Sequence, residues 1–326
     1  MWKERRRGSC ALGLLVVLAL LLSPLTQAPA QPQEKVIYGS STGGGTRLVS
    51  DIIQAKGLHK PYGLDIEYKY FAGPKAIQGL ILGSVDVSYF SPIIAAEQLA
   101  EGNHLVNFEI VMDAHVSFLR PAGAKLNRFE DLKGKRLGFV QRSSSTYNTF
   151  RILCAVRGCD PEKDYKLIIG NPIALMAFIS RKEVDASIHY EPFTSMLIAK
   201  GEAEEVVWFE DLWNETTKGV PLLFSTLAAR KAWLDAHPKA AQGLARAVGQ
   251  ARAWILAHPD EALEIGRKTL EISDPKVIAV LKQRMIRIYK TPWDDKAIEA
   301  GRWQVRKAVE LGIVKKAPDK ELFAKF

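Results

Sequence analysis

The strongest constraint on the fold is a strand, loop and helix plan that the sequence uses twice. Residues 35–90 read as a β-prone run, a Ser- and Gly-rich loop, a helix, a second strand, a short helix and a third strand. Residues 136–190 repeat this order, and the third strand opens on Val-Asp-Val in one copy and Val-Asp-Ala in the other. Strands that alternate with helices build parallel sheets covered by helices. The chain is therefore predicted to contain two similar α/β units.

In the first copy, residues 64–70 alternate apolar and charged side chains, which is the period of a half-buried strand. The helix before this strand is expected to end at Gly57, and the short helix after it to run from Pro74 to a stop at Gly83. The remaining strands of the first copy are expected at 35–38 and 85–90. In the second copy we expect strands at 136–140, 165–169 and 184–190 and helices at 146–157 and 174–180.

From Asp235 onward the sequence reads almost entirely as helix. Two apolar stripes recur at helical spacing, and they are the core faces of scaffold helices. The first stripe is Leu244, Val248, Ala251 and Ile255, and the second is Val277, Leu281, Met285 and Ile288.

The N-terminus has the order of a secretory signal peptide. Basic residues at 3–7 precede an uncharged apolar run at 11–22, and Ala28-Pro29-Ala30 supplies the small residues of a cleavage site. The run is shorter than the roughly 20 apolar residues of a membrane-spanning helix. We therefore expect residues 1–30 to be removed on export to a periplasmic or other extracytoplasmic compartment. An uncleaved membrane anchor is the competing interpretation.

The mature chain is mildly basic and has the composition of a globular protein. Cleavage removes four basic residues and one acidic residue, so the net charge of +9 becomes 9 − 4 + 1 = +6. No run of Lys or Arg survives, which argues against nucleic-acid binding. Two cysteines remain, Cys154 and Cys159. An oxidising compartment permits a disulfide between them, and two inert thiols are the alternative.

Two loops that lead into helices are candidate binding elements. Backbone N–H groups and the positive end of the helix dipole at such a turn can hold an anionic or carbonyl oxygen. Ordinary helix capping by Ser and Thr is the competing explanation, and the occurrence of two such loops at equivalent positions favours binding. The candidates are Ser40, Ser41, Thr42, Gly43 and Gly44 in the first copy and Arg142, Ser143, Ser144 and Ser145 in the second.

Residues at the ends of strands complete the candidate site. Phe71, Tyr89, Phe90 and Ser91 end strands of the first copy, and Tyr190 and Glu191 end the last strand of the second. An aromatic ring can stack on a planar ligand, and a carboxylate can accept a hydrogen bond from a ligand N–H or ammonium group. Burial in the core is the favoured interpretation for Phe71 and Phe90, and simple solvation is the alternative for Glu191.

The ordered motifs along the mature chain resemble the substrate-binding proteins of ABC importers for sulfonates, nitrate and thiamine-precursor pyrimidines. The segments that carry the resemblance are 57–66, 73–76, 82–87, 131–136, 183–193, 229–238 and 258–262. The resemblance implies a two-lobed, Venus-flytrap fold of periplasmic-binding-protein type II. Lobe one would be 35–118 plus 220–326, lobe two 119–219, and the chain would cross between them near 115–121 and 219–225.

The resemblance also implies a function without catalysis or a cofactor. A small molecule would bind in the cleft and be delivered to a membrane permease, with a monomeric binding protein expected. It favours a binding role for Glu191. Pyrimidine-synthesising enzymes share the fold, but the signal peptide argues against that activity.

A secreted serine hydrolase is the rival class. Gly39-Ser40-Ser41-Thr42-Gly43 fits the G-x-S-x-G turn of a nucleophile elbow, with Ser41 as the nucleophile. Ser41 lies only about ten residues after Ala30, however, which leaves no room for the strands that precede such an elbow. The partners would be Asp185 with His189 or His258. Nucleotide-binding glycine motifs and paired metal-ligand spacings are absent from the sequence, so neither a cofactor nor a metal is expected.

Overall fold

The first copy of the repeated plan forms a five-stranded sheet in the order β2-β1-β3-β10-β4. β1 runs parallel to β2 and β3, whereas β10 lies antiparallel between β3 and β4. β10 comes from much later in the chain than its neighbours, so the chain returns to this sheet to complete it. The strands are β1 (Glu34–Ser41), β2 (Leu64–Phe71), β3 (Val87–Phe90), β4 (Leu105–Met112) and β10 (Ser225–Arg230).

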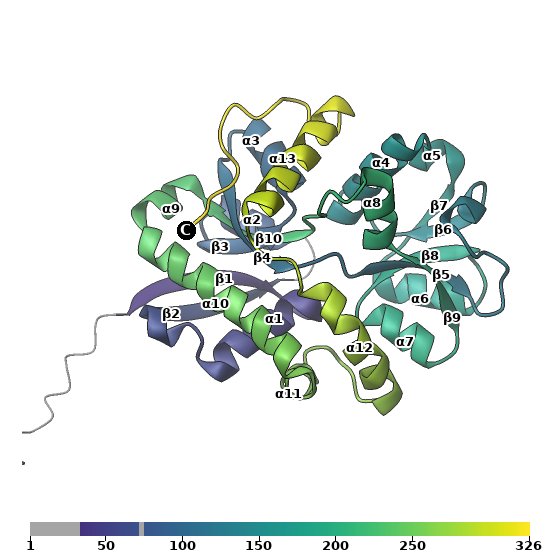
Figure 1. Ribbon diagram of the computed structural model, residues 1–326, viewed down its shortest axis with the longest axis horizontal. Helices are drawn as coiled ribbons and strands as arrows, with labels where there is room; N and C mark the ends of the chain where they lie inside the picture. The colour runs from purple at the N-terminus through teal and green to yellow at the C-terminus, as the bar shows by residue number, and fades with distance from the viewer. Residues whose placement is uncertain (1–32, 72–74) are drawn as a thin grey trace, which may run out of the picture. The chain divides into compact units, whose positions relative to one another are not determined.

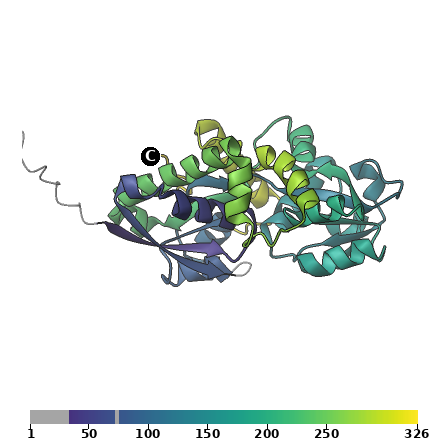
Figure 2. The same cartoon turned by 90° about the horizontal axis from the view of Figure 1, so that it is seen from below.

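The second copy forms a sheet with the same arrangement, in the order β7-β6-β8-β5-β9. β6 is parallel to β7 and β8, and β5 is antiparallel between β8 and β9. Each sheet therefore takes its fourth strand from beyond its own repeat. The two sheets form separate groups in both views (Figures 1 and 2). The strands are β5 (Val116–Pro121), β6 (Arg136–Phe139), β7 (Lys166–Ile169), β8 (Ala186–Tyr190) and β9 (Ala203–Trp208).

The computed structural model describes residues 33–71 and 75–326. The expected signal peptide and the expected start of a helix at Pro74 lie outside the described residues. Gln33–Phe326 forms one compact unit that contains both sheets. Within the described ranges, none of the helices combines the length and the apolar character needed to cross a bilayer.

Two short segments join the sheets. Residues 113–115 connect β4 to β5, and residues 218–224 connect α8 (Phe209–Thr217) to β10. The first crossing therefore ends earlier than the expected 115–121, because Val116 already pairs with Tyr190 in the second sheet. Residues 116–118, expected in lobe one, belong to the second sheet, where Phe118 is fully buried. Below, lobe one and lobe two denote the parts of the chain built on the first and second sheets.

Helix boundaries follow from local residue chemistry. α1 (Gly44–Lys56) ends where Gly57 adopts the left-handed conformation, φ 63°, that glycine permits. α4 (Ser145–Arg157) starts where the Ser144 hydroxyl accepts a hydrogen bond from the Tyr147 N–H, and it also stops at a left-handed glycine. The other helices of the two repeats are α2 (Lys75–Ile81), α3 (Pro92–Ala100), α5 (Pro161–Asp164), α6 (Pro172–Ser180) and α7 (Phe193–Ala199).

The C-terminal part is helical, as predicted, and both apolar stripes are buried. Its position differs from the expectation that it belongs to lobe one alone. α12 lies against α7 of lobe two, and α13 contacts both α3 and α4 (Figure 1). The helices are α9 (Lys231–Ala236), α10 (Pro238–Ala257), α11 (Pro259–Gly266), α12 (Pro275–Ile288) and α13 (Asp295–Glu310).

Candidate functional site

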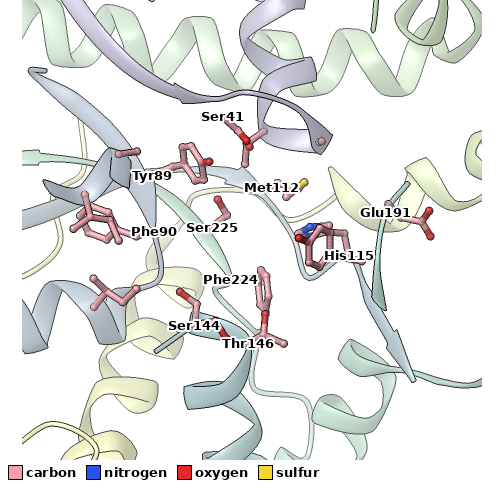
Figure 3. A pocket seen from close by; sticks show the side chains of 18 of the residues that line it. Ser41, Tyr89, Phe90, Met112, His115, Ser144, Thr146, Glu191, Phe224 and Ser225 are labelled. Carbon is pink, nitrogen blue, oxygen red and sulfur yellow. The ribbon is translucent and has the colours of Figure 1, made fainter. Parts of the chain in front are cut away.

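A cavity of about 300 Å³ lies between the two sheets and takes its lining from both lobes and both crossings. This volume is at the small end of the range of roughly 300–1,000 Å³ for small-molecule sites. Figure 3 shows Ser41 on one side, Ser144 and Thr146 on the other, and His115, Phe224 and Ser225 between them. The lining comprises Ser41, Gly43, Gly44, Gly45, Thr46, Ala76, Ile77, Tyr89, Phe90, Ile94, Met112, His115, Gln141, Ser143, Ser144, Ser145, Thr146, Tyr190, Glu191, Phe224 and Ser225.

The N-terminus of α1 opens on this cavity without a side-chain cap. Its N-cap residue is Gly43, whose own N–H donates to the Ser41 hydroxyl over 3.3 Å. The first N–H groups of a helix have no partner within the helix, so those of Gly44 and Gly45 are available to a ligand. A Cβ on Gly45 would lie 2.3 Å from the Met112 sulfur, so a larger residue here would require the Met112 side chain to move. The loop therefore presents main-chain donors in place of side chains.

The N-terminus of α4 faces the same cavity from lobe two. Ser144 caps this helix, because its hydroxyl accepts from the Tyr147 N–H over 3.1 Å. The capping explanation thus holds for Ser144, although the residue also lines the cavity. The first two helical N–H groups, those of Ser145 and Thr146, lack partners within the helix. The positive ends of two helix dipoles consequently meet one space, which favours an anionic group there.

Aromatic side chains supply much of the remaining lining. Tyr89 and Phe90 come from β3, Tyr190 from β8, and His115 and Phe224 from the two crossings. The His115 ring centroid is 5.6 Å from that of Tyr190 and 5.6 Å from that of Phe224. Burial lowers the pKa of His115 to about 4 and raises the pKa of Tyr190 to about 12, so both rings are neutral near pH 7. The walls suit a planar molecule.

Glu191 lines the cavity, but both of its carboxylate oxygens already have protein partners. Oε1 accepts from Nε of Arg284 on α12, and Oε2 accepts from the Ser195 N–H at 3.2 Å and the Ser195 hydroxyl at 2.6 Å. Burial raises the pKa of Glu191, and the nearby Arg284 opposes that shift. The arrangement assigns Glu191 to an ion pair between α12 and lobe two, which leaves it little capacity to accept from a ligand.

The charge balance of the lining follows from these contacts. No Lys or Arg is among the lining residues that the structure describes, and the Arg284 guanidinium that pairs with Glu191 also pairs with Glu205. The helix N-termini are thus the main electropositive groups that reach the cavity. A ligand with one negative charge fits this balance better than a dianion.

Five of the sequence-predicted residues do not line the cavity. Ser40 is the penultimate residue of β1 and is fully buried, with its hydroxyl 2.7 Å from that of Ser50. Arg142 directly precedes the serine loop, but its guanidinium pairs with Glu162, with both N···O distances 2.7 Å, and does not line the cavity. Ser91 is also fully buried, Phe71 packs on the core, and the Thr42 side chain is exposed. The other nine predicted residues do line it.

Several lining residues were not predicted as site residues from the sequence, because they lie on or next to the crossings. Met112, His115, Phe224 and Ser225 occupy or border the segments that connect the sheets. The predicted positions of the two crossings differ from the observed ones by only a few residues. A polar or aromatic residue at a predicted crossing could therefore have been proposed as a cleft residue. Phe90, for which core burial was favoured over a binding role, is both buried and part of the lining.

The residues nominated for a hydrolase do not gather around Ser41. Asp185 binds Arg136, with its two oxygens 2.8 Å from the main-chain N and 2.9 Å from NH2. His189 is buried on β8, and His258 stacks on Trp254 at 4.8 Å. None of the three lines the cavity. A catalytic triad on Ser41 is therefore not assembled from these residues.

The two cysteines do not line the cavity. Cys154 is buried and Cys159 half-buried, and both are free thiols in this structure. Across residues 33–71 and 75–326, His, Cys, Asp and Glu side chains form no cluster of three that could hold a metal ion.

Two α/β lobes that are joined by two crossings and enclose a ligand-sized cavity define a periplasmic-binding-protein fold. The family model described as NMT1/THI5 like matches residues 52–262. The chain belongs to that family, which covers well over half of its length. No curated protein is significantly similar to the chain in sequence.

Solved structures share this fold at low identity. The periplasmic aliphatic sulphonate binding protein SsuA from Escherichia coli has a TM-score of 0.70 and 19% identity, over 88% of this chain and 95% of that chain. The alkanesulfonate-binding protein SsuA from Xanthomonas axonopodis pv. citri, bound to MOPS, has a TM-score of 0.70 and 19% identity, over 90% of this chain and 98% of that chain. The periplasmic nitrate-binding protein NrtA from Synechocystis PCC 6803 has a TM-score of 0.66 and 17% identity, over 88% of this chain and 84% of that chain.

Proposed function

We propose that this protein is an extracytoplasmic solute-binding protein that captures a small organic anion between its lobes and delivers it to the permease of an ABC importer. The observation that carries the proposal is the convergence of two helix N-termini, one from each lobe, on a single aromatic-walled cavity. A ligand held by both helices favours the closed arrangement of the lobes, because only that arrangement offers both sets of donors.

The magnitudes favour an organic ligand over a bare inorganic ion. Each helix terminus contributes roughly 0.3–1 kcal/mol through its dipole, whereas micromolar binding requires about 8 kcal/mol. Hydrogen bonds and ring stacking must supply the rest. The rings of Tyr89, Tyr190 and Phe224 provide the area for a planar remainder. Sulfonates, pyrimidines and aromatic carboxylates therefore form the candidate ligand class.

Export and the absence of catalysis complete the proposal. The charged, apolar and small-residue order of residues 3–30 supports secretion through cleavage near Ala30. The periplasmic location of SsuA and NrtA is consistent with this order. Binding without turnover is supported by the placement of Asp185, His189 and His258 away from Ser41. We expect the mature protein to act as a monomer.

A thermal-shift screen of the mature protein tests the function. The panel contains sulfonates, pyrimidines, aromatic carboxylates and nitrate. A cleft ligand at 100 times its dissociation constant should add about 2.7 kcal/mol to the free energy of unfolding. The same ligand should reduce the radius of gyration in small-angle scattering, because it draws the lobes together.

Two results would count against this function. An unchanged radius of gyration with a confirmed ligand contradicts closure around a bridging molecule. Binding of nitrate as tight as that of the best organic compound contradicts the organic-ligand interpretation, since a bare ion does not need the aromatic walls.

A further inference from the structure

Two cavity-lining residues carry polar side-chain atoms without hydrogen-bond partners, one on the first crossing and one at the start of β10. Nδ1 of His115 and Oγ of Ser225 are shielded from solvent, and neither has a hydrogen-bond partner within the described part of the chain. Both residues line the cavity, and Ser225 is only 5% exposed. A buried polar group that lacks a partner costs about 1–3 kcal/mol, so such groups in native proteins require an explanation.

The surroundings hold His115 in place. Its ring contacts Tyr190 of lobe two and Phe224 of the second crossing, with both centroid distances 5.6 Å. The carboxylate of the nearby Asp113 is engaged elsewhere, since it accepts from the Thr291 N–H over 3.0 Å. His115 is thus positioned by rings and is not oriented by a carboxylate as a catalytic base would be. The Asp113 main-chain carbonyl is near enough to oppose the lowering of the His115 pKa by burial, but no group among the described residues makes a well-formed hydrogen bond to Nδ1.

The position of this pair differs from that of the oxyanion donors. Ser41 and the α1 terminus lie on one side of the cavity and Ser144 and Thr146 on the other, while His115 and Ser225 lie between them (Figure 3). A ligand whose anionic group reaches the helix termini would bring its planar part to the crossings. There it would meet two unpaired polar side chains.

We propose that His115, with Ser225 beside it, is a specificity-determining residue that hydrogen-bonds a second polar group on the planar part of the ligand. The inference rests on the proposed solute-binding function and narrows its ligand class. The class is a monoanionic aromatic or heteroaromatic oxyacid that carries a hydroxyl or amino substituent. An aliphatic sulfonate or an unsubstituted aromatic acid would leave both side chains unpaired.

Matched probes test this inference. The 3- and 4-hydroxybenzenesulfonates are compared by calorimetry with the corresponding toluenesulfonates, which share their shape and charge. A neutral imidazole has one donor and one acceptor nitrogen, and a hydroxyl can pair with either. The wild-type protein should bind at least one hydroxyl isomer about tenfold more tightly than its methyl counterpart, the ratio that one hydrogen bond supplies.

The variants locate the source of that preference. His115→Phe keeps an aromatic ring between Tyr190 and Phe224 but removes both nitrogens, so it should abolish the preference and leave toluenesulfonate affinity within about twofold. Ser225→Ala should reduce the preference in part. The matched control is His258→Phe, which makes the same change at an exposed ring outside the cavity and should keep the preference.

Three outcomes would overturn the inference: equal wild-type affinity for hydroxyl and methyl probes, an unchanged preference in His115→Phe, and no wild-type binding of any of the four probes. Native mass spectrometry of the protein recovered from its own host separates this failure from failure of the function. A small molecule bound to that protein would support solute binding even where the proposed ligand class is wrong.

Discussion

Replacing Arg284 with Met should lower the free energy of unfolding by about 3–5 kcal/mol, the cost of breaking a buried ion pair on one side. The Arg284 side chain is 14% exposed and that of Glu191 only 4%. The substitution keeps much of the apolar stem and removes the charge. Urea unfolding followed by circular dichroism measures the change.

The large effect follows from the number of groups that Arg284 serves. Besides Glu191, its NH2 donates to the Glu205 carboxylate at 2.7 Å and to the Ser117 hydroxyl at 2.8 Å. Without the guanidinium, Glu191 retains only Ser195 and stays buried with an uncompensated charge. Since Arg284 belongs to α12 and its partners to lobe two, the loss also releases a contact between the C-terminal helices and that lobe.

Arg287→Met is the matched control. Both arginines lie over the Trp208 ring, each 4.4 Å from its centroid, so the two variants lose similar stacking. Arg287 pairs with Asp211 in a more exposed position, with exposures of 31% and 57%, and its loss should cost less than about 1 kcal/mol. Equal losses in the two variants would show that the buried carboxylate is not the source of the effect.

Replacing Ser145 with Asp should weaken binding of the anionic ligand by about 5- to 150-fold while leaving the fold intact or more stable. Ser145 is the first residue of α4 and lines the cavity. A carboxylate there would lie about 5 Å from the ligand's charge, a repulsion of about 1–3 kcal/mol at effective dielectric constants between those of water and the protein surface. The same carboxylate at a helix N-terminus stabilises the helix by about 0.3–1 kcal/mol.

The opposite signs of the two effects separate binding from folding. Ser145→Asn has the same shape as the Asp variant without its charge, and should keep affinity within about threefold of wild type. Calorimetry with a ligand from the screen and thermal unfolding of the free proteins give the two quantities. Equal affinity in the Asp and Asn variants would show that the anionic group of the ligand does not lie at the N-terminus of α4.

The repeated α/β plan was predictable because its signals are local. Gly57 and Gly158 stop helices through their left-handed conformations, and the alternation at 64–70 needs no knowledge of neighbours. The antiparallel strands β5 and β10 were harder to predict, since each pairs with residues far away in sequence. β10 reads Ser-Thr-Leu-Ala-Ala-Arg, and its alanines carry little strand preference.

For the candidate site, too, local features were predictable from the sequence and contacts between distant residues were not. Ser41 and the serines of 143–145 were found because loops before helices are visible in sequence, and they line the cavity. The partners of Glu191 and Arg142 could not be identified from the sequence, because Arg284 lies 93 residues from Glu191 and Glu162 lies 20 residues from Arg142. A charged residue at a strand end looks the same in sequence whether it meets a ligand or an arginine from another helix.

Amide NMR of the isotopically labelled mature protein tests the central claim most directly, because the proposed donors are main-chain N–H groups. On addition of a ligand from the screen, the resonances of Gly44 and Gly45 in lobe one and of Ser145 and Thr146 in lobe two should move downfield at the same ligand concentration. This result would show one molecule held by both helix N-termini. Shifts confined to one lobe, or to residues outside the cavity, would contradict capture between the lobes.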